Sequence, residues 1–341
     1  MSGRYSRQER FVPIGTKGQQ ALSEAHVLMI GAGALGASTA EMMVRAGVGT
    51  VSIIDRDYVD LSNLQRQQLY DESDVTEQLP KAEAAKQRLQ QINSDVLVHA
   101  YVGDADVAFF EQILSDESID LMFDGTDNFD IRFIMNDAAQ KYNVPWLYGA
   151  CVSAQSLSFF IRPGKTPCLH CLMGGMPSSG PTCDTAGIIA AASQVTASLQ
   201  VAEALKYLTG NEQALRDAVV SLDLWENTFS NMNVASMKKS DCPSCGTLPT
   251  YPFLAYEAAT KFAVLCGRNT VQIRPQNGKV RDLEMLQKEI SNRVNMTKKN
   301  DFLLSFTSEP YQITAFRDGR VFIHGSSSIE ESKKVYYQYF T

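Results

Sequence analysis

The sequence predicts an α/β domain built on a doubly wound, largely parallel sheet, followed by a small α+β domain. Near the N-terminus, an apolar run, a glycine-rich turn, a helix-forming segment and a second apolar run ending in an acid follow one another, in the order of a β-α-β unit. The last ~90 residues instead alternate short strands, turns and two helices. Since 341 residues exceed what one hydrophobic core holds, we expect two domains.

Composition narrows the class of protein. The chain is 44% hydrophobic and 20% charged, which excludes collagen-like, coiled-coil and wholly disordered proteins. A net charge of −7 argues against a general nucleic-acid binder. The first ten residues contain no apolar run typical of a secretory signal, and no stretch approaches the ~20 apolar residues of a membrane span. We therefore expect a cytoplasmic protein with neither nucleic acid nor membrane as a partner.

The first β-α-β unit carries a nucleotide-binding pattern. A strand is expected at 26–30, the turn GAGALG at 31–36, a helix at 37–46 and a second strand at 51–54, directly before Asp55. The glycines allow a tight turn and close approach of phosphates to free N–H groups at the helix start, and the acid stands where a carboxylate binds ribose hydroxyls. The alternative is a merely structural turn. The predicted nucleotide contacts here are Gly31, Gly33, Ala34, Gly36 and Asp55.

The other elements follow from apolar periodicity and from turn residues. In the first domain we expect helices at 80–91, 109–114 and 187–208 and strands at 97–102, 121–123, 145–148 and 156–161. A linker rich in proline is predicted at 248–254, which bounds the domains at 1–247 and 255–341. In the second domain we expect strands at 270–274, 302–306, 311–316 and 320–324 and helices at 283–294 and 329–339.

The polar segment after the first acid favours a triphosphate over a dinucleotide. Asp57 and the string SNLQRQ (62–67) follow Asp55, and Lys81 begins the next helix. A triphosphate carries about four negative charges and benefits from fixed guanidinium and ammonium groups, for which Arg66 and Lys81 are candidates. The alternative is a solvated loop arginine and an ordinary lysine at a helix start.

Acids and an amide at a strand end form the next pattern. Asp124, Asp127 and Asn128 follow the strand at 121–123, at the carboxyl edge where open α/β sheets bind ligands. Oxygen ligands at this edge suit Mg²⁺ bridging to substrate phosphates. An Asx-rich turn without any ligand is the alternative.

Four of the seven cysteines form two C-x₂-C pairs separated by 70 residues (172–241). Four thiolates at this spacing match tetrahedral Zn²⁺, and a closed shell of four sulfurs is structural, since it leaves no open position for catalysis. His170 then points away from the metal, and a pair of disulfides is the alternative. The predicted zinc ligands are Cys168, Cys171, Cys242 and Cys245.

Cys183 lies outside both pairs and shortly before a long helix, whose dipole could favour a nucleophilic thiolate. A small loop residue is the alternative. Cys151 and Cys266 stand in apolar contexts and are expected to pack in the interior. The four histidines fall in no acid–base constellation, which argues against a hydrolase with a histidine base.

Together these motifs resemble the ThiF/MoeB/HesA family, the prokaryotic relatives of ubiquitin-activating enzymes, over about residues 4–246. The resemblance rests on motifs that occur in order along the chain: RYSRQ (4–8), GAGALG, Asp55-Arg-Asp57, SNLQRQ, Pro80-Lys81, GTDN (125–128), Thr182-Cys183-x-x-Ala-Gly and both C-x₂-C pairs.

The resemblance implies an ATP- and Mg²⁺-dependent adenylyltransferase. Such an enzyme adenylates the C-terminal glycine of a ubiquitin-like sulfur carrier and releases pyrophosphate. Because the attacking carboxylate is already a nucleophile, no general base is needed. By position in the family's motifs, Asp55 would bind the ribose, Arg66 and Lys81 would bind the phosphates, and Asp127 would organise Mg²⁺. Asn63 and Gln65 would line the nucleotide pocket. Arg7 would reach a neighbouring subunit's site, and Cys183 would match a cysteine that links covalently to the carrier in some members.

Partners follow from the same resemblance. We expect a carrier with a Gly-Gly C-terminus, a homodimer and a sulfurtransferase or cysteine desulfurase. Residues 255–341 show no rhodanese loop, and this departure, with the alanine after Thr-Cys-Asp-Thr, favours the thiazole (thiamine) branch over the molybdopterin branch.

Two other classes stay open at this point. An NAD-dependent oxidoreductase would use the glycine turn and Asp55 but would leave SNLQRQ, Lys81 and the cysteine pairs unexplained. A catalytically inactive scaffold would keep the fold and the zinc. Carrier-dependent exchange of pyrophosphate into ATP distinguishes the first, and the effect of replacing Arg66 or Asp127 distinguishes the second.

Overall fold

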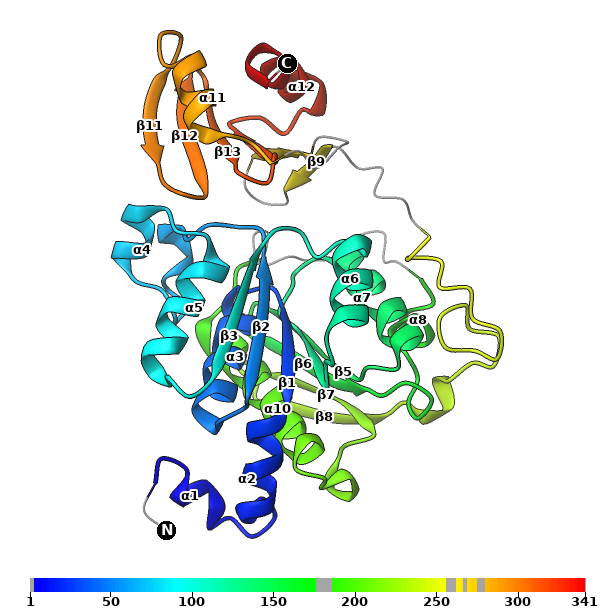
Figure 1. Ribbon diagram of the computed structural model, residues 1–341. Helices are drawn as coiled ribbons and strands as arrows, with labels where there is room; N and C mark the ends of the chain where they lie inside the picture. Colours follow the sequence, from blue (N-terminus) through cyan, green and yellow to red (C-terminus); the bar gives the residue numbers. More distant parts are fainter. Residues whose placement is uncertain (1–2, 176–185, 256–261, 266–268, 275–279, 341) are drawn as a thin grey trace. The chain divides into compact units, whose positions relative to one another are not determined.

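The N-terminal unit is organised by a sheet whose strand order is β3-β2-β1-β4-β5-β6-β7-β8 (Figure 1). The computed structural model describes residues 3–175, 186–255, 262–265, 269–274 and 280–340. Contacts divide the chain into two compact units, Met1–Thr76 with Pro80–Glu257, and Ala258–Thr341 with Glu77–Leu79.

Five neighbouring strands of this sheet are parallel. They are β1 (His26–Ile30), β2 (Thr50–Asp55), β3 (Leu97–Val102), β4 (Leu121–Asp124) and β5 (Trp146–Val152). Apolar runs such as β1 and β4 are buried on both faces, as parallel strands between helical layers must be. The chain turns from one direction of winding to the other between β1 and β4, so the loops after these two strands meet at a topological switch point.

Helices cover both faces of the sheet (Figure 1). One layer contains α3 (Ala34–Ala46), α5 (Lys81–Ile92) and α10 (Ala190–Leu208), and the other contains α6 (Val107–Asp116), α7 (Phe129–Tyr142) and α8 (Leu169–Met173). The chain also forms the shorter elements α1 (Ser6–Glu9), α2 (Gly15–Glu24), η1 (Leu61–Asn63), α4 (Glu72–Glu77) and η2 (Glu212–Ala214). A large apolar cluster fills the space beneath the second layer, with Phe110, Phe133 and Trp146 all fully buried.

The far side of the sheet is antiparallel and ends in an exposed strand. It comprises β6 (Gln155–Ile161), β7 (Ala218–Asp223) and β8 (Thr228–Asn233), followed by η3 (Ala235–Met237). Every residue of the edge strand β8 is exposed, and Trp225 and Phe229 in this hairpin are 74% and 64% exposed. The prediction missed β7 and β8, because β8 (TFSNMN) has no buried face and hence no alternation for the sequence to show.

Several helices also differ from prediction: α11 ends at Ile290 rather than at 294, and α4 and α8 were not predicted. The long helix begins at Ala190 rather than at 187, because Gly187 has a positive φ of 73° and Ile188 forms a bridge to Ser153. Helix α7 was not predicted; the Asn128 side chain caps its start by accepting hydrogen bonds from the N–H groups of Asp130 and Ile131.

The C-terminal unit is α+β, as predicted. Its sheet has the order β11-β12-β13-β14-β10-β9 and is antiparallel throughout. The strands are β9 (Phe262–Leu265), β10 (Thr270–Ile273), β11 (Asn295–Lys299), β12 (Leu303–Ser308), β13 (Tyr311–Phe316) and β14 (Val321–His324). The helices α11 (Leu283–Ile290) and α12 (Ile329–Phe340) share one apolar core with strands β10, β12, β13 and β14.

No helix in the described ranges has the length and hydropathy that crossing a bilayer requires.

Candidate functional site

The glycine turn after β1 is held by close backbone contacts at the switch point. Gly31 has a φ of 95°, and the N–H of Gly31 donates to Ile54 O at 2.8 Å. A Cβ on Gly36 would lie 1.9 Å from Gly31 O, and one on Gly31 or Gly125 would lie 2.8 Å from a carbonyl oxygen of the facing turn. These three positions must therefore be glycine, because backbone atoms occupy the space of a side chain.

Gly33 differs from its neighbours because a side chain there would meet only ordinary contacts. The nearest atoms to a Cβ built there are Gly125 O at 3.8 Å and Gln67 Nε2 at 4.0 Å. Gly33 is the N-cap of α3, which begins at Ala34 without a capping side chain. No side chain therefore caps the first N–H groups of α3, and helix starts of this kind can bind phosphate.

Asp55, at the end of β2, is hydrogen-bonded to the turn itself. Its Oδ2 accepts from Ala32 N at 2.6 Å and its Oδ1 from Asp57 N at 2.7 Å. Burial raises the pKa of this carboxyl, whereas the nearby Lys81 ammonium acts in the opposite direction. The carboxylate therefore holds the conformation of the turn.

Lys81 is almost fully buried, 3% exposed, at the start of α5. Its Nζ lies 3.3 Å from Asp57 Oδ2, and its N–H donates to Asp57 O at 2.8 Å. The buried Tyr70 hydroxyl donates to Ala32 O at 2.7 Å and to Lys81 O at 3.2 Å; burial raises its pKa well above the usual value. These hydrogen bonds therefore hold the glycine turn, Lys81 and the segment at Asp57 in fixed positions relative to one another.

Some side chains of the SNLQRQ segment are buried, and others face solvent. The N–H of Gln67 donates to Asn63 O at 3.0 Å, which closes a helical turn and places these two residues on its inner side, where both are buried. Gln65, predicted to line the pocket, is exposed. Arg66 is partly exposed, and its Nη1 donates to Ser62 O at 3.0 Å. Sequence reasoning therefore missed Gln67, which a helical i, i+4 relation to Asn63 would have indicated.

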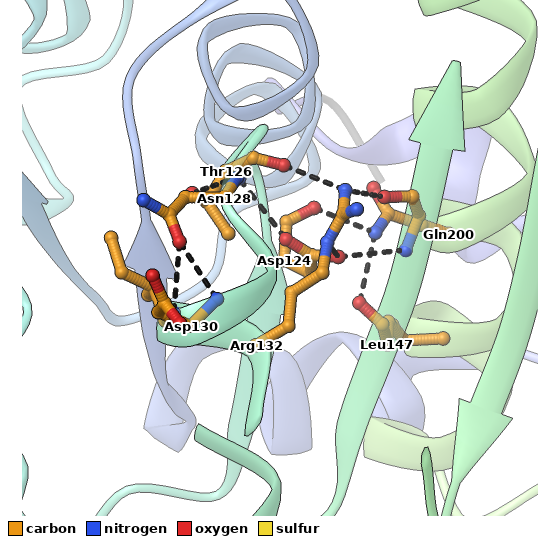
Figure 2. A network of polar contacts seen from close by, with 9 residues as sticks. Asp124, Thr126, Asn128, Asp130, Arg132, Leu147 and Gln200 are labelled. Carbon is orange, nitrogen blue, oxygen red and sulfur yellow. Dashed lines mark hydrogen bonds and ion pairs between the residues drawn. The ribbon is translucent and has the colours of Figure 1, made fainter. Parts of the chain in front are cut away.

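A buried ion pair lies beneath the loop that follows β4 (Figure 2). Asp124 is fully buried, and its Oδ2 lies 2.8 Å from Arg132 Nε. The Arg132 Nη2 group also donates to Thr126 O at 2.7 Å and to Gly149 O at 2.9 Å. Burial raises the pKa of Asp124 to about 6, against the opposing effect of Arg132.

Gln200 ties this pair to α10. Its Nε2 donates to Asp124 O at 3.1 Å and to Leu147 O at 2.9 Å (Figure 2). Thr39 Oγ1 donates to its Oε1 at 3.3 Å. Neither Arg132 nor Gln200 was predicted, because buried polar residues in helices carry no sequence signal of their own.

Of the three predicted magnesium ligands, only Asp127 has a carboxylate that faces solvent. Asp124 is committed to Arg132, and Asn128 Oδ1 accepts two backbone N–H groups of α7 at 2.7 and 3.3 Å. Asp127 also contributes to the negative charge that raises the pKa of Arg56. Of these three residues, Asp127 is therefore the one whose side-chain oxygens are available as ligands for a divalent cation.

The four paired cysteines converge on one point. Cys168 Sγ lies 3.6 Å from Cys242 Sγ, Cys171 Sγ lies 3.4 Å from Cys245 Sγ, and all four sulfurs fall within 4.8 Å of one another. Sulfurs at ~2.3 Å from a tetrahedral Zn²⁺ stand ~3.8 Å apart, so the cluster has the size of a zinc shell. His170 is outside it, with its ring against Phe133 and Phe253.

Arg7 does not lie at the glycine turn of its own chain. Arg7 is exposed on α1, which is seated at the last turn of α3, since Gln8 Nε2 donates to Ala46 O at 2.8 Å. The 13 residues of α3 span ~20 Å, so α1 lies at the opposite end of that helix from Gly33. Cys183 and Cys266 lie outside the described residues.

Known proteins match both the sequence and the fold. The model of the ThiF family matches residues 5–244. The chain is 51% identical over 339 residues, 99% of each chain, to "Sulfur carrier protein ThiS adenylyltransferase" of Bacillus subtilis (strain 168). It is 34% identical over 247 residues, 71% of this chain and 96% of the relative, to "Molybdopterin-synthase adenylyltransferase" of Escherichia coli (strain K12).

A solved structure shares the fold at low sequence identity. The crystal structure of E. coli MccB with ATP superposes with a TM-score of 0.62 at 22% identity, covering 72% of this chain and 74% of that chain.

We predict that Cys242→Ser loses one bound zinc ion per chain and unfolds at lower temperature than the parent. Removing one thiolate opens the shell for all four ligands, and the free energy of metal binding is part of the free energy of folding. The loss should far exceed the ~1 kcal/mol of an ordinary substitution. Metal analysis and thermal melting measure it. Cys151→Ser and Cys183→Ser are the controls and should retain zinc; equal loss in either would mean that the cysteines are partitioned differently.

We predict that Arg132→Met destabilises the chain by ~3–5 kcal/mol at pH 8 and by less at pH 5. Asp124 already has a pKa raised from 3.8 to about 6, so its contribution to stability is complete below ~4 and is lost as the pH rises through about 6. Without Arg132 the carboxyl titrates higher still, and a charged carboxylate is left unpaired at pH 8. Urea unfolding across this range measures the effect.

The double variant Asp124→Asn/Arg132→Met is the control for that experiment. It has no carboxyl to titrate at this position, so its free energy of unfolding should differ from the parent's without the added loss at high pH. An Arg132→Met deficit of the same size at pH 5 and pH 8 would contradict the prediction.

Proposed function

The chain belongs to the ThiF family, and from this we propose that it adenylates the C-terminal glycine of a ubiquitin-like sulfur carrier, using ATP and releasing pyrophosphate. The observation that carries the proposal is 51% identity across 99% of both chains to a protein named as an adenylyltransferase of the carrier ThiS. The geometry supports the proposal, because the start of α3 has no side-chain cap and the buried Lys81 is hydrogen-bonded to the segment that follows β2. The segment with Arg66 follows it in the same loop.

In this reaction the carrier's terminal carboxylate attacks the α-phosphorus of ATP. The bond from the α-phosphorus to the bridging oxygen breaks, and pyrophosphate leaves with that electron pair. Because the nucleophile is already ionised, the protein needs no base: it aligns two anions and stabilises the charge on the transferring phosphoryl group. The N-terminus of α3 and the Lys81 ammonium would hold the phosphates, and Arg66 would move from its contact with Ser62 O to reach them.

Lys81 already faces an anion in the free protein, since Asp57 Oδ2 lies 3.3 Å from its Nζ. Burying an ammonium group away from water costs free energy unless an anion of this kind pairs with it. A phosphate that entered beside it would share this cation and gain a charge-assisted hydrogen bond without reorganisation of the lysine. We assign Asp57 the part of holding Lys81 in place for the nucleotide.

We propose Mg²⁺ and Zn²⁺ as the metal ions. Asp127 would hold Mg²⁺ beside the phosphates, where the ion, when bound, neutralises the charge on the departing pyrophosphate. Cys168, Cys171, Cys242 and Cys245 would hold Zn²⁺, which is structural because four sulfurs complete its shell.

The edge of the sheet supports a protein as the substrate. Within the described part of the chain, β8 has no strand on its outer side, and exposed Trp225, Phe229 and Met232 lie in the same hairpin. Edge strands flanked by exposed aromatic residues are features of protein-binding surfaces. We infer that the carrier contacts this hairpin while its flexible C-terminus reaches the nucleotide.

The pathway proposed is the thiazole branch of thiamine biosynthesis. Identity to the ThiS adenylyltransferase is 51% and extends over the C-terminal unit, whereas identity to the molybdopterin-synthase adenylyltransferase is 34% over 71% of this chain. The acyl-adenylate is an activated carboxyl that a sulfur nucleophile can attack. We therefore propose a sulfurtransferase or cysteine desulfurase as the next partner, with Cys183 as the thiol that links to the carrier.

We also propose a homodimer in which Arg7 acts in the partner's site. Within one chain, α1 is at the far end of α3 from the phosphate-facing turn, so the exposed Arg7 has no short route to its own nucleotide. A second copy could present the arginine to the transferring phosphate.

We predict that Arg66→Ala and Asp127→Ala each reduce carrier-dependent exchange of pyrophosphate into ATP by roughly 10²–10³-fold, because each removes a charged contact worth ~3–4 kcal/mol in the transition state. Neither side chain is buried, so melting temperatures should stay near the parent's. Arg88→Ala and Asp130→Ala, which are exposed residues of the same types, should keep normal exchange. Near-parental exchange in both site variants would refute the adenylation mechanism as assigned.

We predict that Arg7→Ala and Arg66→Ala are each inactive alone but restore exchange when mixed under subunit exchange. In a heterodimer, one of the two sites would receive Arg66 from its own chain and Arg7 from the other. Recovery should approach a quarter of parental activity, since about half of the dimers are mixed and each contains one complete site. If the mixture stays inactive while subunits exchange, Arg7 does not act across the interface.

A further inference from the structure

Three side-chain amides meet at the C-terminal turn of α3, at the opposite end of this helix from the glycine turn. Ala46 O accepts from Gln8 Nε2 at 2.8 Å and from Gln19 Nε2 at 2.9 Å. Val44 O accepts from Asn93 Nδ2 at 2.9 Å. The last carbonyls of a helix have no partner within the helix, and side-chain donors of this kind satisfy them. The amides come from three different segments, and that of Gln8 belongs to α1.

Both amide hydrogens of Gln8 are bonded within the protein. Its Nε2 donates to Gln19 Oε1 at 2.7 Å as well as to Ala46 O, so neither hydrogen is left for another partner. Asn93 Nδ2 likewise donates to the hydroxyl of Tyr5 at 2.8 Å. A polar network whose donors are all satisfied rigidifies the elements that it joins, which here are α1 and the end of α3.

The ring of Tyr5 makes a second contact between these two helices. Gly47 ends α3 with a φ of 83°, and a Cβ built there would lie 2.4 Å from Tyr5 Cζ. The tyrosine ring therefore lies directly on the backbone of this glycine, in the space that a side chain would need. Tyr5 and Gln8 thus attach α1 to α3 at two points, through a ring and through an amide.

This attachment determines which way Arg7 faces. α1 has four residues, far fewer than the ~12–15 that an isolated helix needs to be stable in water, so its conformation depends on what it packs against. Tyr5 and Gln8 are three positions apart and therefore share one side of the helical turn, which is partly buried. Arg7 is off that side and is exposed.

We propose that Tyr5 and Gln8 are positioning residues, which hold α1 on the end of α3 and thereby keep the Arg7 guanidinium in place for the transferring phosphate in the neighbouring subunit's site. The inference rests on the proposed homodimer and its adenylation reaction. It gives two neighbours of Arg7 a part in catalysis without any contact with the nucleotide. A defect in Tyr5 or Gln8 therefore impairs the partner's site and spares the site of its own chain.

Gln8→Glu tests this role, because it keeps the size of the side chain and turns a donor of two hydrogen bonds into an acceptor that faces Gln19 Oε1 and Ala46 O. The kcat of carrier-dependent pyrophosphate exchange should fall by roughly 10- to 100-fold, the effect of displacing an aligned group by about 1 Å. KM for ATP should stay within about 2-fold of the parent's. Gln112→Glu makes the same charge change at an exposed glutamine of α6 and should exchange normally.

Mixing variants under subunit exchange distinguishes positioning from a general structural defect. Gln8→Glu mixed with Arg66→Ala should recover about a quarter of parental activity, because each mixed dimer has one site with its own Arg66 and a well-placed Arg7 from the other chain. Gln8→Glu mixed with Arg7→Ala should recover nothing. The reverse pattern would show that Gln8→Glu damages its own site, and it would overturn the proposal, as would a parental kcat in Gln8→Glu.

Tyr5→Phe is the second variant, since it removes only the hydroxyl that accepts from Asn93 and keeps the ring that lies on Gly47. The loss of one neutral hydrogen bond should lower kcat by roughly 3- to 10-fold. Its mixtures should follow the pattern expected for Gln8→Glu. Recovery with Arg7→Ala instead of Arg66→Ala would contradict the role of the tyrosine.

Hydrogen exchange of the backbone amides at 5–10 provides a readout that is independent of activity. Exchange should be slow in the parent and in Gln112→Glu, and faster in Gln8→Glu and Tyr5→Phe, because the network no longer holds α1. Equal exchange in the parent and Gln8→Glu would overturn the proposal. This measurement also separates the inference from the proposed function: a parent that exchanges no pyrophosphate refutes adenylation, whereas hydrogen exchange still decides whether Tyr5 and Gln8 hold α1.

Discussion

The close approach of two backbone turns at the switch point is the constraint on which the N-terminal unit depends. The loop after β1 and the loop after β4 meet so tightly that Gly31, Gly36 and Gly125 have no room for a Cβ. This contact brings α3 against the end of β4 and leaves its first N–H groups uncovered at Gly33. The phosphate binding that we propose would therefore be a consequence of how the sheet reverses its winding, because the same packing that joins the two halves leaves the helix start without a side-chain cap.

Charged groups around this contact are paired before any substrate arrives. Asp55 binds the turn, Lys81 faces Asp57, and Asp124 is neutralised by Arg132. Desolvation would otherwise make each of these charges costly. The result is a preorganised surface, in which the buried pairs hold the loops and the exposed charges, Arg66 and Asp127, stay available.

Two features at a distance from the nucleotide complete the proposed enzyme. The cysteine cluster joins α8 to the segment around Cys242, a closure of more than 70 residues that four converging sulfurs make specific. The exposed β7–β8 hairpin lies at one edge of the sheet, where we propose that a folded partner contacts it. The cysteine cluster thus serves the stability of the proposed enzyme, and the hairpin serves its recognition of a partner.

The sequence by itself determined the features that are local in the chain. The β-α-β unit, the glycine turn, the acid after β2, both C-x₂-C pairs and the α+β character of the C-terminal unit follow from spacing and periodicity, because each depends on neighbours within a few residues or on ligand chemistry that one metal imposes. The expected positions of Asn63, Lys81 and Asp127 near the phosphate-facing turn follow from the rule that ligands gather at the carboxyl edge.

Only the tertiary structure decided which polar side chains are buried and paired inside the fold and which face solvent. Asp124 and Asp127 look alike in the string Asp124-Gly-Thr-Asp127, yet one is buried against Arg132 and the other faces solvent. Gln65 and Gln67 differ in the same way, since a helical turn directs one outward and the other toward Gly33. The distinction is absent from the sequence because burial depends on segments far away in the chain, and the partners of a polar atom are known only once those segments have packed against it.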